Sequence, residues 1–224
     1  MFLYSVSGSH YGECGAQLHI VWTYWSSLFL GALVPVIYNT IIKKRPLSET
    51  GVTRKYWIAS LILGFVLGVV TYFGTLATIE LPPFMELLPL AFMSLTVGLF
   101  EAIFFRGWIQ LRFEKSFGAI PAIFIGSAFY AFYHVGYGMN ISEIGTLFLL
   151  GTSFAVAFRV TRSILVLFPF YTWLGGLFTN VSEGLRIPFE SIYGFLNVLI
   201  WIIVLIGVIG YKRKKSMKPN SEAD

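Results

Sequence analysis

The stretch FMSLTVGLFEAIFFRGWIQL, residues 92–111, decides how this chain folds. It is mostly apolar over about 20 residues, the length that a membrane-spanning helix needs. It nevertheless contains Glu101 and Arg106. A charge near the centre of a bilayer costs about 2.5–3.5 kcal/mol on insertion scales. The stretch therefore predicts a membrane-spanning helix that turns its two ionisable side chains towards the interior of a helical bundle.

The composition of the whole chain is that of a membrane protein. Of its 224 residues, 56% are hydrophobic and 12% are charged, and the mean hydropathy is +0.75. Soluble domains carry about 25% charged residues, so this share is too small to cover a surface that faces water. We therefore expect an all-α membrane bundle in a single domain, with the lipid bilayer as its main partner.

Apolar runs and helix breakers divide the chain into about seven predicted spans. The bundle covers 18–211, with spans at about 18–42, 56–79, 84–111, 118–138, 144–158, 163–182 and 191–211. The fifth span is short, and Pro169 and the pair Gly175-Gly176 interrupt the sixth. An outer segment, 1–17, precedes the bundle, and a basic tail, 212–224, expected to be disordered and cytoplasmic, follows it.

Basic residues gather on one face of this arrangement. With seven spans, nearly all of the 16 Lys and Arg residues fall on the side of the 43–55 loop and the tail. Arg186 falls on the other side, together with several Glu residues. Because cytoplasmic loops carry the excess of Lys and Arg, we expect the N-terminus outside and the C-terminus in the cytoplasm. The net charge of +5 is thus read as a topology signal, and we expect no nucleic-acid partner.

A third ionisable group, His134, lies in the apolar stretch IFIGSAFYAFYHVGYG, residues 123–138. Three such groups within the spans of one small protein favour a functional site, and we expect them to face one another. Judged from the rise per residue along each helix, Glu101 and His134 could meet slightly to the cytoplasmic side of the bilayer midplane. Glu101 and Arg106 differ by about 140° around an α-helix, so Arg106 reaches round to the carboxylate, contacts another helix, or snorkels to the headgroups.

A buried carboxylate beside a histidine suggests hydrolysis. Glu101 would act as a general base that deprotonates water for attack on a carbonyl, and His134 would bind that water or stabilise the oxyanion. Arg106 would hold the carboxylate or a carboxyl group of the substrate. The structural alternatives are a neutral, hydrogen-bonded Glu101 and a structural His134. No H-E-x-x-H motif occurs, so we expect no metal ion and no cofactor.

These residues resemble, in order and spacing, the CPBP family of intramembrane proteases, which includes the type II CAAX prenyl endopeptidases and bacteriocin-processing or immunity proteins. The family motif Glu-Glu-x-x-x-Arg resembles EAIFFR at 101–106, and Phe-x-x-x-His resembles YAFYH at 130–134. A third motif, His followed four residues later by Asn, would end at Asn180. The resemblance covers about residues 43–182.

The resemblance implies roles for four residues. Glu101 would be the general base, His134 its partner for the water and Arg106 an orienting group, and Asn180 would be carried over from the third motif. The chain departs from the family at Ala102, which replaces the second Glu.

Two further departures concern the other motifs. Tyr130 stands for Phe, and no His occupies the third motif. That position is Gly176 when counted back from Asn180, or about Tyr171 when counted forward from Ser163.

The function expected from the resemblance is that of an intramembrane endopeptidase. It would cut a hydrophobic or prenylated peptide near its membrane anchor, on the cytoplasmic side. Two alternatives stay open. A catalytically impaired relative would serve as a scaffold or immunity protein, which the missing Glu and His favour. A small proton-coupled transporter would use Glu101 and His134 as a relay.

Overall fold

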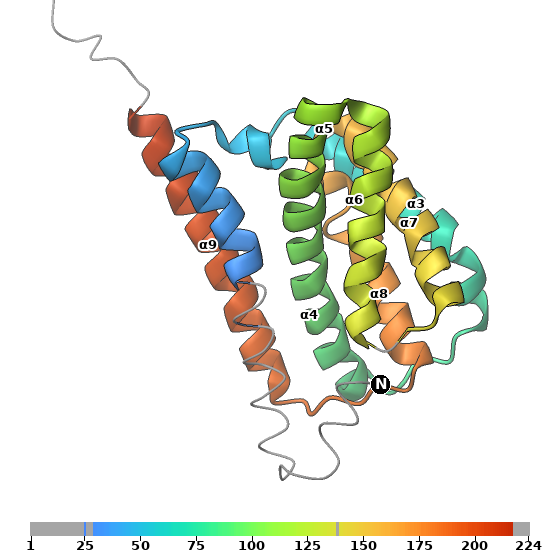
Figure 1. Ribbon diagram of the computed structural model, residues 1–224. Helices are drawn as coiled ribbons and strands as arrows, with labels where there is room; N and C mark the ends of the chain where they lie inside the picture. Colours follow the sequence, from blue (N-terminus) through green and yellow to red (C-terminus); the bar gives the residue numbers. More distant parts are fainter. Residues whose placement is uncertain (1–24, 26–28, 138, 217–224) are drawn as a thin grey trace, which may run out of the picture.

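The computed structural model describes residues 25, 29–137 and 139–216 and shows a bundle of helices (Figure 1). No β-strand occurs within these ranges. The predicted all-α membrane bundle is therefore confirmed. The predicted outer segment, 1–17, and the end of the tail, 217–224, lie outside the described residues.

Seven helical segments make up the described part of the chain. They are the helix Phe29–Ile42, which ends in the π-helix η1 (Tyr38–Ile42), α3 (Trp57–Thr78), the continuous segment of α4 (Phe84–Glu101), η3 (Ala102–Gln110) and α5 (Leu111–Phe117), α6 (Ala119–Tyr133), α7 (Ile141–Thr161), α8 (Phe170–Ser182) and α9 (Ser191–Ser216). Short 3-10 turns form η2 (Leu47–Thr50), η4 (His134–Tyr137) and η5 (Ile164–Val166). Four segments are long and apolar enough to cross a membrane, namely Trp57–Thr78, Phe84–Phe117, Ile141–Thr161 and Ser191–Lys215. The chain is an integral membrane protein.

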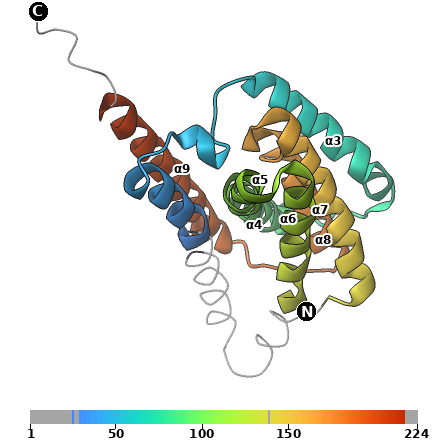
Figure 2. The ribbon, with the colours of Figure 1, turned by 45° about the horizontal axis from the view of Figure 1, so that its top comes forward.

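The segment Phe84–Phe117 lies at the centre of the bundle (Figure 2). On one side it faces α9 and the helix Phe29–Ile42, and on the other it faces α6, α7 and α8, while α3 packs against α8. It is the most buried of the four long apolar helices. The stretch that carries Glu101 and Arg106 is therefore enclosed by protein, as the cost of charge in lipid requires.

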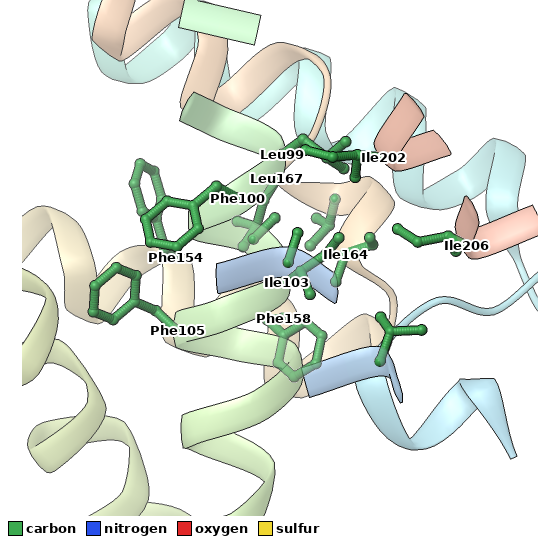
Figure 3. Packing of buried hydrophobic residues seen from close by; sticks show 14 of the residues in the cluster. Leu99, Phe100, Ile103, Phe105, Phe154, Phe158, Ile164, Leu167, Ile202 and Ile206 are labelled. Carbon is green, nitrogen blue, oxygen red and sulfur yellow. The ribbon is translucent and has the colours of Figure 1, made fainter. Parts of the chain in front are cut away.

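The main hydrophobic core surrounds the middle of this segment (Figure 3). Residues from α4, η3, α7, η5 and α9 meet there, among them Leu99, Phe100, Ile103, Phe105, Phe154, Phe158, Ile164, Leu167, Ile202 and Ile206. Lipid tails are as apolar as these side chains, so close packing rather than removal from water holds the helices together. Gly107 illustrates how close the packing is, because a Cβ there would lie 2.0 Å from the Thr50 carbonyl oxygen.

The α7 helix is longer than the predicted span of 144–158. It runs from Ile141 to Thr161, because Asn140 forms a capping box with Glu143. The Asn140 side chain accepts hydrogen bonds from the backbone N–H groups of Ser142 and Glu143, and the Glu143 carboxylate accepts one from the Asn140 N–H. The third span is also longer than predicted and continues to Phe117.

The predicted break at Pro169 is confirmed, and the predicted break at Gly175-Gly176 is wrong. The 3-10 turn η5 precedes Pro169 and α8 begins at Phe170, but both glycines lie inside α8. A Cβ at Gly175 would lie 2.2 Å from the Tyr72 hydroxyl oxygen. This glycine therefore permits a close approach of α3 to α8, the use that small residues have between membrane helices.

The two ends of the bundle carry different charges. The basic end consists of 43–55, 112–117, 159–162 and 212–215, and the acidic end of 80–86, 139–143 and 183–190. At the basic end Glu114 pairs with Arg162 (2.6 Å) and Arg159 (3.7 Å). The C-terminal helix α9 extends through Ser216 into the predicted tail, and Arg213 donates a hydrogen bond to the Thr40 carbonyl. The assignment of the basic end to the cytoplasm stays a prediction.

Candidate active site

A cavity of about 870 Å³ lies between α3, α4, α6, α7 and α8. It extends from Glu101, in the interior, to the exposed side chains of Glu143 and Glu183 at the acidic end. Three of the four predicted site residues line it: Glu101, His134 and Asn180. Arg106 is not among the lining residues.

Glu101 and His134 face each other across the inner part of this cavity. Glu101 is the last residue of α4 and is 8% exposed, and His134 begins η4 directly after α6. The Glu101 Oε1 and His134 Nε2 atoms are 3.9 Å apart. On its other side, His134 Nδ1 lies 2.8 Å from the Tyr130 carbonyl oxygen. Because a carbonyl can only accept, Nδ1 carries a proton, and Nε2 is the ring nitrogen that faces Glu101.

Tyr130 contributes more to the site than the sequence indicated. The side chain is 5% exposed and lies close enough to the Glu101 carboxylate to interact with it. Its ring packs edge-on against the His134 ring at 4.9 Å. The departure from the family's Phe thus keeps an aromatic ring beside the histidine and adds a hydroxyl that can orient the carboxylate. The i,i+4 spacing of Tyr130 and His134 was the available signal.

Arg106 is buried behind Tyr130 and does not snorkel. The side chain is 1% exposed, so the headgroup alternative is wrong. Its guanidinium carbon lies 5.4 Å from the Tyr130 ring centre. The two terminal nitrogens have no hydrogen-bond partner among the described residues, and they lie 3.4–3.6 Å from where a Cβ would stand at Gly151 and Gly126. These glycines make room for the guanidinium, which lies within electrostatic range of Glu101 but forms no ion pair with it below 4.0 Å.

The backbone between Glu101 and Arg106 explains this position. The prediction of an offset of about 140° assumed a regular α-helix. The structure instead has the π-helix η3 over Ala102–Gln110, directly after Glu101. A π-helix is bonded from i to i+5, so residues five apart come closer to one side of the helix, and such bulges often occur at functional sites.

The structure distinguishes the two possible alignments of the third motif by which residues line the cavity. Gly176 and Asn180, one turn apart on α8, both line the cavity. Tyr171 is not among the lining residues, and its hydroxyl is bonded to the hydroxyls of Ser153 (2.9 Å) and Thr71 (3.1 Å). Of the two candidate positions for the family's His, Gly176 is thus the one that lines the cavity. Asn180 donates a hydrogen bond from Nδ2 to the Ser94 hydroxyl at 3.3 Å.

The remaining lining residues define what the cavity can hold. Its apolar surface comes from Met93, Val97, Leu147, Leu150 and Phe154. Within the described ranges, no three His, Cys, Asp or Glu side chains gather closely enough to hold a metal ion. The polar groups of the cavity are thus concentrated around Glu101 and His134 at the inner end and along α8.

The comparison with known families agrees with these motifs. The family model described as "Type II CAAX prenyl endopeptidase Rce1-like" matches residues 83–179. This match covers α4 through most of α8 and includes Glu101, Arg106 and His134. The match is consistent with the resemblance to the CPBP family, and it makes residues 83–179 similar to the Rce1-like type II CAAX prenyl endopeptidases. No curated protein and no solved structure matches the chain.

Proposed function

We propose that this protein is an intramembrane endopeptidase in which Glu101 activates the attacking water. The observation that carries the proposal is the separation of 3.9 Å between Glu101 Oε1 and His134 Nε2 inside the bundle. The Rce1-like domain supports the class of reaction. The geometry supports the choice of residues.

The two facing atoms are suited to polarise one water molecule. In the proposed reactive state Nε2 of His134 is unprotonated, so this nitrogen and the Glu101 carboxylate both accept hydrogen bonds, and a water between them donates a hydrogen to each. Its oxygen lone pair is then directed away from both, towards the carbonyl carbon of a peptide in the cavity. Glu101 takes the proton as the C–O bond forms. It returns the proton to the leaving amine as the C–N bond breaks.

Tyr130 and Arg106 are proposed to position this pair. The Tyr130 hydroxyl would donate to the Glu101 carboxylate in the reactive arrangement, and the Tyr130 carbonyl keeps the proton on Nδ1 of His134. The Arg106 guanidinium behind the Tyr130 ring adds a positive charge within electrostatic range of Glu101. A desolvated charge–aromatic contact of this kind contributes about 2 kcal/mol. The cavity thus holds its acceptor pair in a fixed orientation before any substrate enters.

The substrate is proposed to be a hydrophobic or prenylated peptide that enters from the acidic end. Apolar lining suits an apolar chain, and Glu143 and Glu183 lie where the peptide would leave the cavity. If the basic end faces the cytoplasm, entry is from the opposite face. The sequence-based expectations of a cytoplasmic basic end and of cytoplasmic cleavage are then incompatible, and the positive-inside rule favours keeping the first.

The test is the variant Glu101→Gln, which keeps the shape of the side chain and removes its basicity. The probe is a quenched-fluorescent peptide ending in S-farnesyl cysteine, with protein and peptide reconstituted in phosphatidylcholine–phosphatidylglycerol vesicles. We expect cleavage to fall by about 10²–10⁴-fold, the usual contribution of a general base, with an unchanged melting temperature. The matched control is Glu190→Gln, an exposed residue of the acidic end. Wild-type activity in Glu101→Gln would refute the mechanism.

A second candidate function is that of a non-catalytic scaffold or immunity protein that binds membrane peptides. Two observations favour it: the second Glu of the first motif is Ala102, which is fully buried in the core, and the His of the third motif is Gly176. In that case the wild-type protein binds the farnesylated peptide without cutting it. Glu101→Gln then leaves both binding and the biological effect intact.

A further inference from the structure

The side-chain amide of Asn180 offers an open hydrogen-bonding group to the cavity. Asn180 belongs to α8, is half-buried and lines the cavity. Its Nδ2 gives one hydrogen to the Ser94 hydroxyl. The Oδ1 atom accepts no hydrogen bond from the described residues, and it is not one of their buried unpaired atoms. A ligand in the cavity can therefore reach Oδ1, together with the second hydrogen of Nδ2.

Ser94 fixes the direction in which this amide points. It lies on α4, which packs side by side with α8 (Figure 1), and it is 2% exposed. Its hydroxyl oxygen accepts the hydrogen bond from Asn180 Nδ2 over 3.3 Å. This contact holds the nitrogen against α4 and turns Oδ1 away from it. The amide is thus oriented before a ligand enters.

The alignment of α8 against α4 can be followed at two glycines. A Cβ at Gly98 would lie 2.6 Å from Thr172 Oγ1, and one at Gly176 would lie 3.5 Å from the Ser94 side chain. The two helices are antiparallel, because α4 runs from the acidic end to the basic end and α8 runs the other way. Each further turn of α8 therefore meets α4 at a position further from Glu101.

Asn180 lies at least two helical turns from Glu101 by this alignment. Ser94 and Glu101 are seven residues apart in α4, which corresponds to about 10 Å along the helix and nearly the same side of it. Asn180 is also one turn before Glu183, at the mouth of the cavity. An extended peptide advances about 3.3 Å per residue, so about three residues span the distance from Glu101 to the Asn180 amide.

The chemistry of this position fits the backbone of an extended peptide. In such a chain the N–H and C=O groups of one residue point to the same side. Asn180 Oδ1 can accept the N–H, and the second hydrogen of Nδ2 can be donated to the C=O. Met93, Val97 and Leu147 make other parts of the lining apolar. A peptide group that enters without a partner would lose its hydrogen bonds to water, so a matching amide favours its entry.

We propose that Asn180 is a specificity-determining residue that binds one backbone group of the substrate about three residues from the scissile bond. This inference rests on the proposed function for the identity of the substrate. By holding one residue of the peptide, Asn180 sets which bond lies at the water beside Glu101. Ser94 is a positioning residue that acts through Asn180. Neither side chain contacts the reacting atoms.

An ester scan of the substrate tests this subsite in the wild-type protein. In a series of farnesylated peptides, one amide bond at a time within four residues of the scissile bond is replaced by an ester, which removes one N–H. We expect a single sensitive position, two or three residues from the scissile bond. There the loss of one hydrogen bond should raise KM by about 2- to 10-fold and leave kcat within about twofold.

The variant Asn180→Leu, which keeps the size of the side chain, assigns the sensitive position to its partner. We expect it to raise KM for the all-amide peptide by the same factor, and the ester at that position to have no further effect. The matched control is Asn197→Leu, an exposed residue of α9 that does not line the cavity. It should keep the wild-type KM and the full sensitivity to the ester.

The variant Ser94→Ala tests the positioning role. The Asn180 amide stays in place but loses the partner that orients it. We expect a rise in KM at the lower end of the same range, with the same ester position still the sensitive one. An unchanged KM in Ser94→Ala would remove Ser94 from the proposal.

Three results would overturn the role of Asn180: a scan without a sensitive position, effects of the ester and of Asn180→Leu that multiply, or a loss in kcat at constant KM. The last would place Asn180 at the reacting atoms. The scan needs no variant, so it decides even where Asn180→Leu fails to fold. A wild-type protein that cuts no peptide would overturn the proposed function instead. The scan is then read as the Kd of the same peptides, where the same single position should be sensitive.

Discussion

The basic and acidic ends of the bundle differ in how several of their charged side chains are placed. At the basic end they close the structure: Glu114 holds Arg159 and Arg162, and Glu49 holds Lys115 at 2.7 Å. At the acidic end Glu143 and Glu183 are exposed beside a cavity that reaches Glu101. The central segment Phe84–Phe117 is thus closed at the basic end and accessible from the acidic end.

The largest expected effect concerns which side of the membrane each end faces. In a Cys14→Ser background, Glu143→Cys places a thiol at the cavity mouth and Lys115→Cys places one at the basic end. We expect a membrane-impermeant maleimide to label Glu143→Cys fully in intact cells and Lys115→Cys only after permeabilisation, because the basic end should be cytoplasmic. Labelling is measured by the mass shift of the protein. The reverse pattern would place the cavity mouth in the cytoplasm.

The second-largest expected effect concerns how tightly the helices pack at the basic, closed end. Gly107→Ala brings a Cβ to 2.0 Å from the Thr50 carbonyl oxygen, a backbone atom that can move only if η2 shifts. We expect a loss of about 1–3 kcal/mol or more in the free energy of unfolding, measured by thermal unfolding in detergent.

The matched control for this substitution is Gly145→Ala, near the open end in α7. There a Cβ meets nothing within 4 Å. We expect it to be neutral or stabilising by about 0.5–1 kcal/mol, because alanine is the better helix former. Equal losses in both variants would show that the two ends are equally tightly packed.

The smallest expected effect is the pH dependence of the closed end. The hydrogen bond from the Lys115 ammonium, with the charges of Lys115 and Arg45, holds the pKa of the Glu49 carboxyl below its ordinary 4.5 against the opposing effect of burial. A lowered pKa contributes stability that is fully present above pH 4.5 and is lost as the pH falls through the folded-state value.

The variant Lys115→Ala measures this contribution. It should lower stability by a few tenths of a kcal/mol at pH 7, because solvent screens the pair, and by progressively less as the pH falls below 4.5. Melting temperatures of both proteins across this range give the difference. A gap that grew at low pH would contradict the assignment of the stability to Glu49.

The sequence predicted the class of fold and the main residues of the cavity for physical reasons. Charges are so costly in lipid that Glu101 and His134 had to face the interior, and they do. Helix ends were less predictable: the capping box at Asn140 was readable from Asn and Glu three apart, but the apolar run alone suggested a shorter helix. The assumed period of 3.6 residues hid the π-helix that carries Arg106.

Tyr72 illustrates a limit of a different kind. Nothing in its local sequence, GVVTYFGTL at 68–76, separates it from the other aromatic residues of the spans. The position of its side chain against α8 depends on Gly175, which is 103 positions away and was predicted to break the helix. Only the packing of α3 on α8 brings the two together, and tertiary contacts of this kind leave no pattern in a single sequence.

The size of the cavity has a consequence for any peptide that is cut there. A membrane-spanning helix of 20 residues is about 30 Å long and 10–12 Å thick, which corresponds to roughly 2,400–3,400 Å³. The cavity of about 870 Å³ holds only a fraction of such a helix. Under the proposed function, a substrate would therefore unwind or end near the scissile bond. A short piece of its chain would then enter the cavity while the rest stays in lipid or water. The cavity would then select substrates by how easily their helix unwinds near the scissile bond, before any side chain is recognised.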